Sequence, residues 1–217
     1  TTQEASSGVT HLSIIKNPML LPNGSEAFDK KIRDAFGAIC RIVGHPVPLE
    51  IERKYLVTAA VNVKDFVPTA EMVVITQFYL PHDGSEHLQR IRKRVHRDHT
   101  AYFLTEKIPV KHGVVIEKEK LITEDEYEQF FKKRDQKLFV IEKNRWCFIW
   151  QNQYFEYDEF LGDCSGLYEL EIELTEEQQE VALPDFFTTA GIQEVTGNER
   201  YSNYFLARIP YRGPGAT

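Results

Sequence analysis

From Pro46 onward, polar and apolar residues alternate over short segments that turn residues separate. Alternation with a period of two, in segments rich in β-branched and aromatic residues, predicts β-strands. The strand candidates are 50–57, 71–80, 86–96, 101–107, 113–122, 138–150, 153–160 and 167–174. About eight strands that follow one another closely are expected to pair mostly antiparallel, and they favour a closed barrel.

Helical patterns within this region are confined to short stretches. Thr123 with Glu126 and Thr175 with Gln178 have the spacing of a capping box, in which two side chains satisfy backbone groups at a helix start. These pairs predict two short helices between the strands. The expected fold class is therefore α+β and mainly β, an eight-stranded antiparallel closed barrel with flanking helices.

The first 46 residues have a different pattern. His11–Ile15 is expected to form a short buried strand, and a Pro/Asn/Gly loop follows at 17–24. A helix should then begin at the N-cap Ser25 and end at Gly44, because apolar residues recur between them at helical spacing. We therefore expect an N-terminal extension at 1–46, a barrel domain at 47–210 and a loose tail at 211–217.

Charged residues occupy strand positions that are normally apolar. Glu50, Glu52 and Lys54 lie two residues apart and so share one face of the first strand. The same spacing recurs in Arg90/Arg92, Glu117/Glu119, Lys143/Arg145, Glu156/Asp158 and Glu171/Glu173, with Lys107 at a strand end. One such pair is typical of a solvated sheet face. Several together, with apolar residues on the opposite faces, predict a barrel that is apolar outside and charged inside.

A barrel interior with bases on some walls and acids on others is suited to a polyanion together with divalent cations. Carboxylate oxygens are suitable ligands for Mg²⁺ and Mn²⁺, and these ions bridge to phosphate oxygens. The charge pattern therefore indicates a metal site beside a phosphate site.

Composition narrows the class of protein further. At 217 residues with 42% hydrophobic content, the chain can bury one substantial core. A net charge of −7 argues against a general nucleic-acid binder, although Gln89–Arg97 is densely basic. Cys40, Cys147 and Cys164 have no metal or disulfide spacing, which favours a reducing compartment. The lack of a long apolar run or a signal peptide predicts a soluble protein, and the start at Thr1 indicates a piece of a longer one.

An ordered series of motifs runs through roughly residues 48 to 209. It consists of EIERKYLV, TQFYL, RIRKR, TEK, VIEKEKLIT, VIEKNRW, FEYDEF, LYELEIEL and EVTGNERYSNYFLA. In this order the motifs resemble the CYTH domain of the triphosphate tunnel metalloenzyme superfamily. The hallmark of that family is ExExK on the first strand of an eight-stranded antiparallel tunnel. The ordered series is specific, whereas ExExK alone is not.

The resemblance implies roles for the residues at matching positions. The metal-binding carboxylates would be Glu50, Glu52, Glu171 and Glu173, with Asp158 as a helper. The phosphate-binding bases would be Lys54, Arg90, Arg92, Lys107, Lys143, Arg145 and Arg200. The candidate catalytic residues are Lys54, Lys143 and Tyr79, which would orient Lys54, and the further tunnel acids are Glu117, Glu119 and Glu156. The family's QGYL motif reads QFYL here, so Phe78 is expected to narrow one wall of the tunnel.

Two classes of function follow from the resemblance. The first is a hydrolase that uses Mg²⁺ or Mn²⁺ to cleave tripolyphosphate or a nucleoside or thiamine triphosphate. The second is a non-catalytic domain that recognises nucleotides or anionic phospholipid headgroups through the tunnel or the basic segment 90–97. Within that segment, alternation directs Arg94 and His96 inward, and Lys93 and Arg97 elsewhere. Vesicle binding that weakens with salt would distinguish the second class.

The N-terminal extension resembles the tail of a P-loop nucleotide-binding domain, which precedes a CYTH domain in certain two-domain proteins. The P-loop motif GxxxxGK[ST] is absent from this sequence. An ordinary helical extension packed on the barrel is the alternative. The two-domain resemblance implies GTP and phosphoinositide binding and a membrane-protein cargo. It also implies a cytoplasmic location peripheral to membranes, and no nucleic-acid partner is expected.

Overall fold

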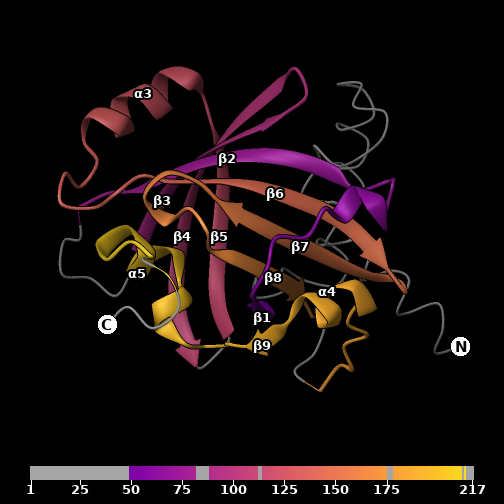
Figure 1. The fold of residues 1–217 in the computed structure, drawn as a ribbon. Helices are drawn as coiled ribbons and strands as arrows, with labels where there is room; N and C mark the ends of the chain where they lie inside the picture. Colours follow the sequence, from indigo (N-terminus) through magenta and orange to yellow (C-terminus); the bar gives the residue numbers. More distant parts are fainter. Residues whose placement is uncertain (1–48, 82–87, 112–113, 175–177, 212, 214–217) are drawn as a thin grey trace, which may run out of the picture.

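Nine β-strands make up about half of the described part of the chain (Figure 1). The computed structural model describes residues 49–81, 88–111, 114–174, 178–211 and 213, without the side chains of 49, 50 and 108–116. The strands are β1 (Leu49–Val57), β2 (Glu71–Tyr79), β3 (Leu88–His96), β4 (His99–Lys111), β5 (Val114–Ile122), β6 (Ile141–Trp150), β7 (Gln153–Phe160), β8 (Tyr168–Glu173) and β9 (Ile192–Glu194). The helices are α3 (Glu124–Lys132), α4 (Asp185–Ala190) and α5 (Asn203–Arg208), with the 3₁₀ turns η2 (Val63–Asp65), η3 (Gly162–Cys164) and η4 (Glu199–Tyr201). None of the helices described is long and apolar enough to cross a membrane.

The strands pair antiparallel in the order β5-β4-β3-β2-β6-β7-β8-β1-β9. β1 also pairs with β5, through Leu49 with Ile116 and Ile51 with Val114. This extra pairing joins the two ends of the row from β5 to β1 into a closed ring. The predicted antiparallel barrel is therefore confirmed. The short β9, which pairs with β1 at Tyr55–Val57, was not predicted.

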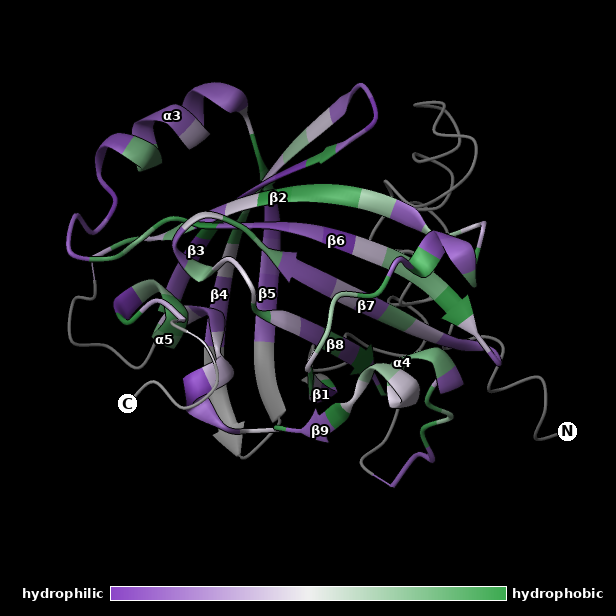
Figure 2. Ribbon diagram, viewed as in Figure 1, coloured by the Kyte–Doolittle hydropathy of each residue, from purple (hydrophilic) through white to green (hydrophobic). Residues whose placement is uncertain are grey.

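The largest hydrophobic cluster lies on the outer side of the barrel wall. Tyr157, Leu170 and Ile172 are fully buried in it, although they alternate along β7 and β8 with the charged residues. Val63 of η2 and Phe187 of α4 belong to the same cluster, so segments that flank the barrel cover this face. The strands differ in hydropathy: Figure 2 shows that β2 is mostly hydrophobic and β7 mostly hydrophilic. On β7 and β8 the barrel wall is thus apolar outside and charged inside, as the alternation predicts, whereas Val73 and Ile75 of β2 form an apolar cluster on the interior face.

α3 begins at the predicted capping box. Thr123 Oγ1 accepts a hydrogen bond from Glu126 N at 3.2 Å, and Glu126 Oε2 accepts one from Thr123 N at 2.7 Å. The helix predicted after Thr175 is not formed over 178–184, and residues 175–177 lie outside the described part. A local capping pattern is insufficient there because the acidic segment lacks an apolar stripe to bury. The next helix, α4, begins only after Pro184.

Phe78 packs on the outside of the barrel. Its ring meets Tyr127 and Phe131 of α3 edge-on, with centroid separations of 5.4 and 5.3 Å. Because side chains alternate along β2, Gln77 and Tyr79 face the interior instead. The expectation that Phe78 narrows the tunnel is therefore wrong. The aromatic side chain at this position docks α3 onto the sheet.

The predictions for 1–46 fall on residues outside the described part, and the same holds for Cys40. Cys147 and Cys164 are buried and form no disulfide. The absence of a disulfide between them agrees with the sequence-based expectation for these two residues.

Candidate functional site

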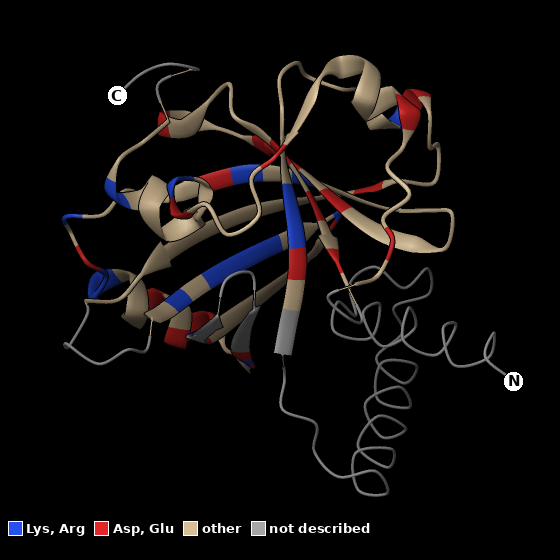
Figure 3. Ribbon diagram, turned by 90° about the horizontal axis from the view of Figure 1, so that it is seen from below, with Lys and Arg blue, Asp and Glu red and all other residues tan. Residues whose placement is uncertain are grey.

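Basic side chains are enclosed inside the barrel. Lys54, Arg90, Arg92, Lys143 and Arg145 have exposures between 1% and 8%. They come from β1, β3 and β6, and strand register places acids beside them, since Lys54 pairs with Glu171 and Arg145 with Asp158. Figure 3 shows Lys and Arg segments of the barrel strands interleaved with Asp and Glu segments. The fold therefore brings the predicted bases and acids of these strands onto one interior surface.

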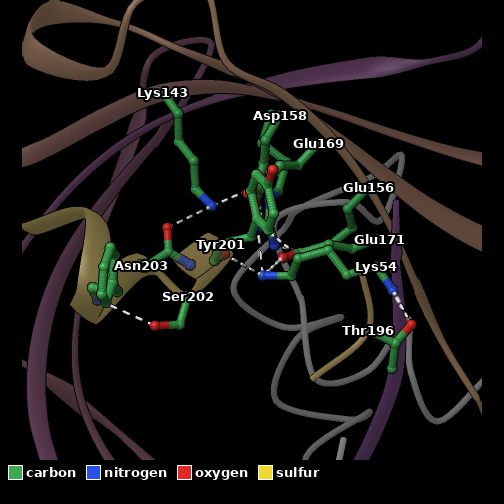
Figure 4. A network of polar contacts seen from close by, with 12 residues as sticks. Lys54, Lys143, Glu156, Asp158, Glu169, Glu171, Thr196, Tyr201, Ser202 and Asn203 are labelled. Carbon is green, nitrogen blue, oxygen red and sulfur yellow. Dashed lines mark hydrogen bonds and ion pairs between the residues drawn. The ribbon is translucent and has the colours of Figure 1, made fainter. Parts of the chain in front are cut away.

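Two lysines lie at the centre of a polar network (Figure 4). The Lys54 ammonium is 2.8 Å from Glu171 Oε1 and 3.6 Å from Glu169 Oε2. The Lys143 ammonium donates a hydrogen bond of 2.5 Å to Asp158 Oδ2. It also lies 5.0 Å from the ring centroid of Phe160. Each ammonium group thus has a carboxylate partner on a neighbouring wall.

Arg145 connects three acids within the same network. Its Nε and Nη2 donate to the two oxygens of Asp158 at 2.7 and 2.6 Å, which is a bidentate arrangement. Nη2 also donates to Glu171 Oε2 at 2.7 Å, and Nη1 pairs with Glu156. Lys54, Lys143, Arg145 and their acids therefore form one connected group of charges.

The acids and bases of this group shift one another's pKa values. Burial lowers the pKa of the Lys54 ammonium, but Glu171, Glu169 and Glu52 outweigh it and hold that pKa well above its ordinary value. Burial raises the pKa of the Glu171 carboxyl, yet Lys54 and Arg145 hold it well below its ordinary range. Both groups are therefore charged at neutral pH.

In two other members of the group, burial sets the direction of the pKa shift. Burial and the nearby Arg145 lower the pKa of Lys143 to about 8, against the pull of Asp158. Burial also raises the pKa of the Glu169 carboxyl to about 7, and the Lys54 charge only partly offsets this. These two groups mark the least solvated part of the network.

A second group of charges lies on β3, β4 and β5. Arg92 Nη2 is 2.6 Å from Glu119 Oε1, and Thr105 Oγ1 donates to the same oxygen at 3.0 Å. Lys107 Nζ is 2.8 Å from Glu117 Oε2, and Arg90 Nη2 is 3.6 Å from Glu117 Oε1. The predicted tunnel acids of β5 are thus the counter-ions of the bases on β3 and β4.

The remaining predicted site residues lie around these groups. Glu52 and Glu173 are directly opposite each other across β1 and β8, whereas the side chain of Glu50 lies outside the described part. Tyr79 is buried, and its hydroxyl accepts a hydrogen bond from Gln77 Nε2 at 3.4 Å. Arg200 is exposed on η4 and does not enter the enclosed network.

Three contributors were missed in the sequence. Glu169 continues the alternation of Glu171 and Glu173 on β8, so the same spacing could have identified it. The backbone carbonyl of Tyr201 accepts a hydrogen bond from Lys54 Nζ at 3.2 Å, and Asn203 Oδ1 accepts one from Lys143 Nζ at 3.4 Å. No sequence pattern identifies these last two, because the contacts depend on where the chain returns to the barrel.

The donor chemistry of the acids fits a divalent cation. Across the strand pair β1 and β8, the like charges of Glu52 and Glu173 stand opposite each other, and a cation would relieve their repulsion. Within the described ranges, no three His, Cys, Asp or Glu side chains are already arranged to hold a metal ion. Glu171 and Asp158 are instead turned toward Lys54, Lys143 and Arg145. Metal binding would therefore require these two carboxylates to change partners.

A closed antiparallel barrel whose interior carries paired acids and bases is the arrangement expected of a triphosphate tunnel protein. The family model of the CYTH domain matches residues 48–202. The chain belongs to the CYTH domain family.

Similar proteins agree with this family assignment. An inorganic triphosphatase from Acetivibrio thermocellus is 42% identical over 73 residues, which are 34% of this chain and 44% of that protein. The matched region is thus less than half of that relative. The crystal structure of an inorganic triphosphatase covers 76% of this chain and 97% of its own, with 30% identity and a TM-score of 0.51. A Hippeastrum protein with a dominant triphosphatase activity covers 76% and 98% at 18% identity and a TM-score of 0.57, which shows the fold alone.

Proposed function

We propose that this chain is a tunnel domain that binds a linear triphosphate or polyphosphate with a divalent cation and hydrolyses it. The observation that carries the proposal is the set of buried bases, each held beside acids in one interior. Burying so many charges is costly unless they serve one another or a ligand. The inorganic triphosphatases among the similar proteins support the same substrate class.

The two groups of bases would bind the phosphate oxygens. Arg90, Arg92 and Lys107 form one group, and Lys54, Lys143 and Arg145 form the other. In the ligand-free protein their partners are carboxylates. Phosphate oxygens would replace these carboxylates as acceptors, so the bases need only exchange one anion for another. Arginine is suited to this exchange because its planar fork fits carboxylate and phosphate alike.

The chemistry would be the attack of water on a terminal phosphoryl group. The water oxygen forms a bond to phosphorus while the bridging P–O bond breaks, and the leaving diphosphate keeps the bonding electrons. Lys54, Lys143 and Arg145 would neutralise the charge that gathers on the leaving oxygen. Positioning and charge stabilisation would thus supply most of the rate enhancement.

The acids that would hold a cation are Glu52, Glu171 and Glu173. Glu50 lies two residues before Glu52 on β1, and Asp158 lies on β7, which pairs with β8. When bound, Mg²⁺ or Mn²⁺ would neutralise phosphate charge and lower the pKa of the attacking water. Release of Glu171 and Asp158 from their bases would coincide with the arrival of phosphate oxygens at those bases. Metal and substrate binding should therefore be mutually supportive.

Phosphate release from tripolyphosphate, ATP and GTP, with and without Mg²⁺ or Mn²⁺, tests the proposal. Glu52→Gln and Glu171→Gln should each reduce the metal-dependent rate about 100-fold or more, because each removes charge from the predicted cation site. Glu159→Gln is the matched control. It lies next to Asp158 on the outer face of β7, where its carboxylate accepts a hydrogen bond from Trp146 Nε1 at 3.3 Å.

Hydrolysis that survives in both interior variants would contradict the proposed site. If no phosphate is released, calorimetry with tripolyphosphate and Mg²⁺ decides what remains of the proposal. Metal-dependent binding without turnover would show a sensor domain that uses the same bases. Absence of both binding and release would overturn the proposed function.

The non-catalytic alternative has less support in this fold. Arg94 and His96 are buried in the barrel, so that basic segment offers only Lys93 on the outer face of β3 and Arg97 in the turn after it. Arg97 is itself paired with Glu71 at 2.8 Å. Phosphoinositide binding, GTP binding, a membrane-protein cargo and a preceding P-loop domain remain predictions. The same holds for the resemblance to one two-domain protein, the insect TRPL translocation defect protein.

A further inference from the structure

The segment 199–208 contacts both interior lysines at once (Figure 4). It consists of η4, Ser202 and α5, and we call it the cap segment. The backbone carbonyl of Tyr201 accepts a hydrogen bond from Lys54 Nζ at 3.2 Å. The amide oxygen of Asn203 accepts one from Lys143 Nζ at 3.4 Å. Both acceptors are neutral, in contrast to the carboxylates that hold the same two ammonium groups from the barrel walls.

The cap segment is anchored by contacts that do not involve the lysines. Leu206 and Ala207 are buried in an apolar cluster that includes Ile141 at the start of β6. Tyr204 meets Tyr79 edge-on, with ring centroids 5.1 Å apart. Ser202 Oγ caps α5 by accepting a hydrogen bond from Phe205 N at 3.1 Å, and Ala207 O accepts one from Phe139 N at 2.7 Å. The two acceptors therefore have positions fixed by packing.

The lysines themselves come from separate walls of the barrel. In the strand order, β7 and β8 lie between β6, which carries Lys143, and β1, which carries Lys54. Three strand spacings amount to about 14 Å around the wall. Lysine side chains are long and flexible. Because the Cα atoms of the two lysines lie that far apart, external acceptors are needed to hold the two ammonium groups in one place. The cap segment supplies such acceptors for both.

A neutral acceptor differs from a carboxylate in what it leaves available. A carboxylate that pairs with an ammonium group compensates its charge, whereas an amide or backbone carbonyl orients the group and leaves the full positive charge for a ligand. Asp158 and Glu171 are the acids that would change partners when a cation and phosphate bind. Asn203 and the Tyr201 carbonyl would remain in place.

We propose that Asn203 is a positioning residue, which holds the Lys143 ammonium toward a bound triphosphate beside the Lys54 ammonium held by the Tyr201 carbonyl. The proposal rests on the proposed function and deepens it, because it names a residue outside the predicted site that sets substrate affinity. Asn203 acts through Lys143 and does not itself contact phosphate.

Calorimetric binding of tripolyphosphate with Mg²⁺ to the full chain tests this role, together with the KM and kcat of its hydrolysis. Asn203→Ala should weaken binding about two- to tenfold, the effect of one hydrogen bond, with a rise in KM larger than the fall in kcat. Asn203→Asp should weaken binding further, because a carboxylate at this position would compensate the Lys143 charge. Arg208→Ala is the control, since Arg208 is exposed at the other end of the same helix.

A double-mutant cycle with Lys143→Met separates positioning from a merely structural role. If Asn203 acts through Lys143, Asn203→Ala should have no further effect on tripolyphosphate binding in the Lys143→Met background. An equal loss in both backgrounds, or no loss in Asn203→Ala alone, would overturn the inference while leaving the proposed function intact. A parent chain that neither binds nor hydrolyses tripolyphosphate would overturn both.

Discussion

Glu169 is enclosed by protein on every side, with an exposure of 0%. Among the residues described, neither of its carboxyl oxygens accepts a hydrogen bond, and its charged partner is Lys54 at 3.6 Å. Burial raises the pKa of this carboxyl to about 7 from its ordinary value of 4.5. A raised pKa means that the folded protein binds this proton more tightly than the unfolded chain does. The resulting stability is present below about pH 4.5 and is lost as the pH rises through about 7.

Glu169→Gln should remove this pH dependence. Between pH 5 and pH 8 the parent chain should lose up to about 3 kcal/mol of unfolding free energy relative to the variant, because a shift of one pKa unit corresponds to 1.36 kcal/mol. Urea denaturation at the two pH values measures the difference. Parallel profiles for the parent and Glu169→Gln would show that this carboxyl titrates normally.

Substitutions at Arg145 and Arg97 test how burial changes the contribution of an ion pair to the unfolding free energy. Arg145→Met should cost about 3–5 kcal/mol of unfolding free energy, because it leaves Asp158 and Glu171 buried with one partner fewer. Arg97→Met should cost less than about 1 kcal/mol, although Arg97 is 2.8 Å from Glu71, because its side chain is 66% exposed. Urea denaturation of both variants at pH 7 makes the comparison. Equal losses would show that the interior network does not depend on Arg145.

At the scale of elements, the turn after α4 depends on Gly191. Its φ is 86°, a conformation that glycine adopts most easily, and a Cβ atom there would lie 2.3 Å from Thr58 Oγ1. Gly191 also accepts a backbone hydrogen bond from Thr58 N at 2.9 Å, where the chain leaves β1. The close approach therefore joins the end of α4 to the end of β1, just before β9.

Gly191→Ala should destabilise the protein more than Gly166→Ala. Gly166 has a similar φ of 90°, but a methyl group there would meet no atom within 4 Å, so its substitution carries backbone strain alone. That strain is worth about 1–2 kcal/mol, and Gly191→Ala should add about 1 kcal/mol or more for the contact with Thr58. Thermal unfolding of the two variants measures the difference. Equal effects would mean that Thr58 moves aside without cost.

Long elements could be predicted from the sequence, and short ones could not. The eight barrel strands were predicted because runs rich in β-branched and aromatic residues, most of them with a period of two, persist over six or more residues in each. β9 has three residues and α4 and α5 have six each, too few for a periodic signal. Their positions depend on tertiary contacts, such as the edge of β1 that receives β9.

The same distinction holds for the site. Interior acids and bases such as Lys143 and Glu171 follow from alternation, and even Glu169 could have been found in this way. Asn203 could not, because its contact with Lys143 joins residues 60 positions apart. Phe78 was misjudged because the family's glycine suggested a tunnel wall, whereas side-chain alternation already assigns it to the outer face.

At the scale of the whole molecule, a ligand that binds only the closed barrel should stabilise it. Tripolyphosphate with Mg²⁺ at 100 times its dissociation constant should add about 2.7 kcal/mol and raise Tm by several degrees. Sodium sulfate at matched ionic strength is the control for screening and for general salt effects. An equal rise in Tm with sulfate would contradict specific binding in the interior.

On β8 the inside-out distribution of residues also separates the positions that build the outer core from those that carry the interior charges. Along β8, Leu170 and Ile172 belong to the outer hydrophobic cluster, whereas Glu169, Glu171 and Glu173 occupy the other face. Neighbouring residues of β8 therefore have to meet different requirements. A saturation scan of β8 that scores protein abundance and phosphate release separately should show two alternating sets of positions. Substitutions at Leu170 and Ile172 should reduce abundance most, and substitutions at the glutamate positions should reduce phosphate release most.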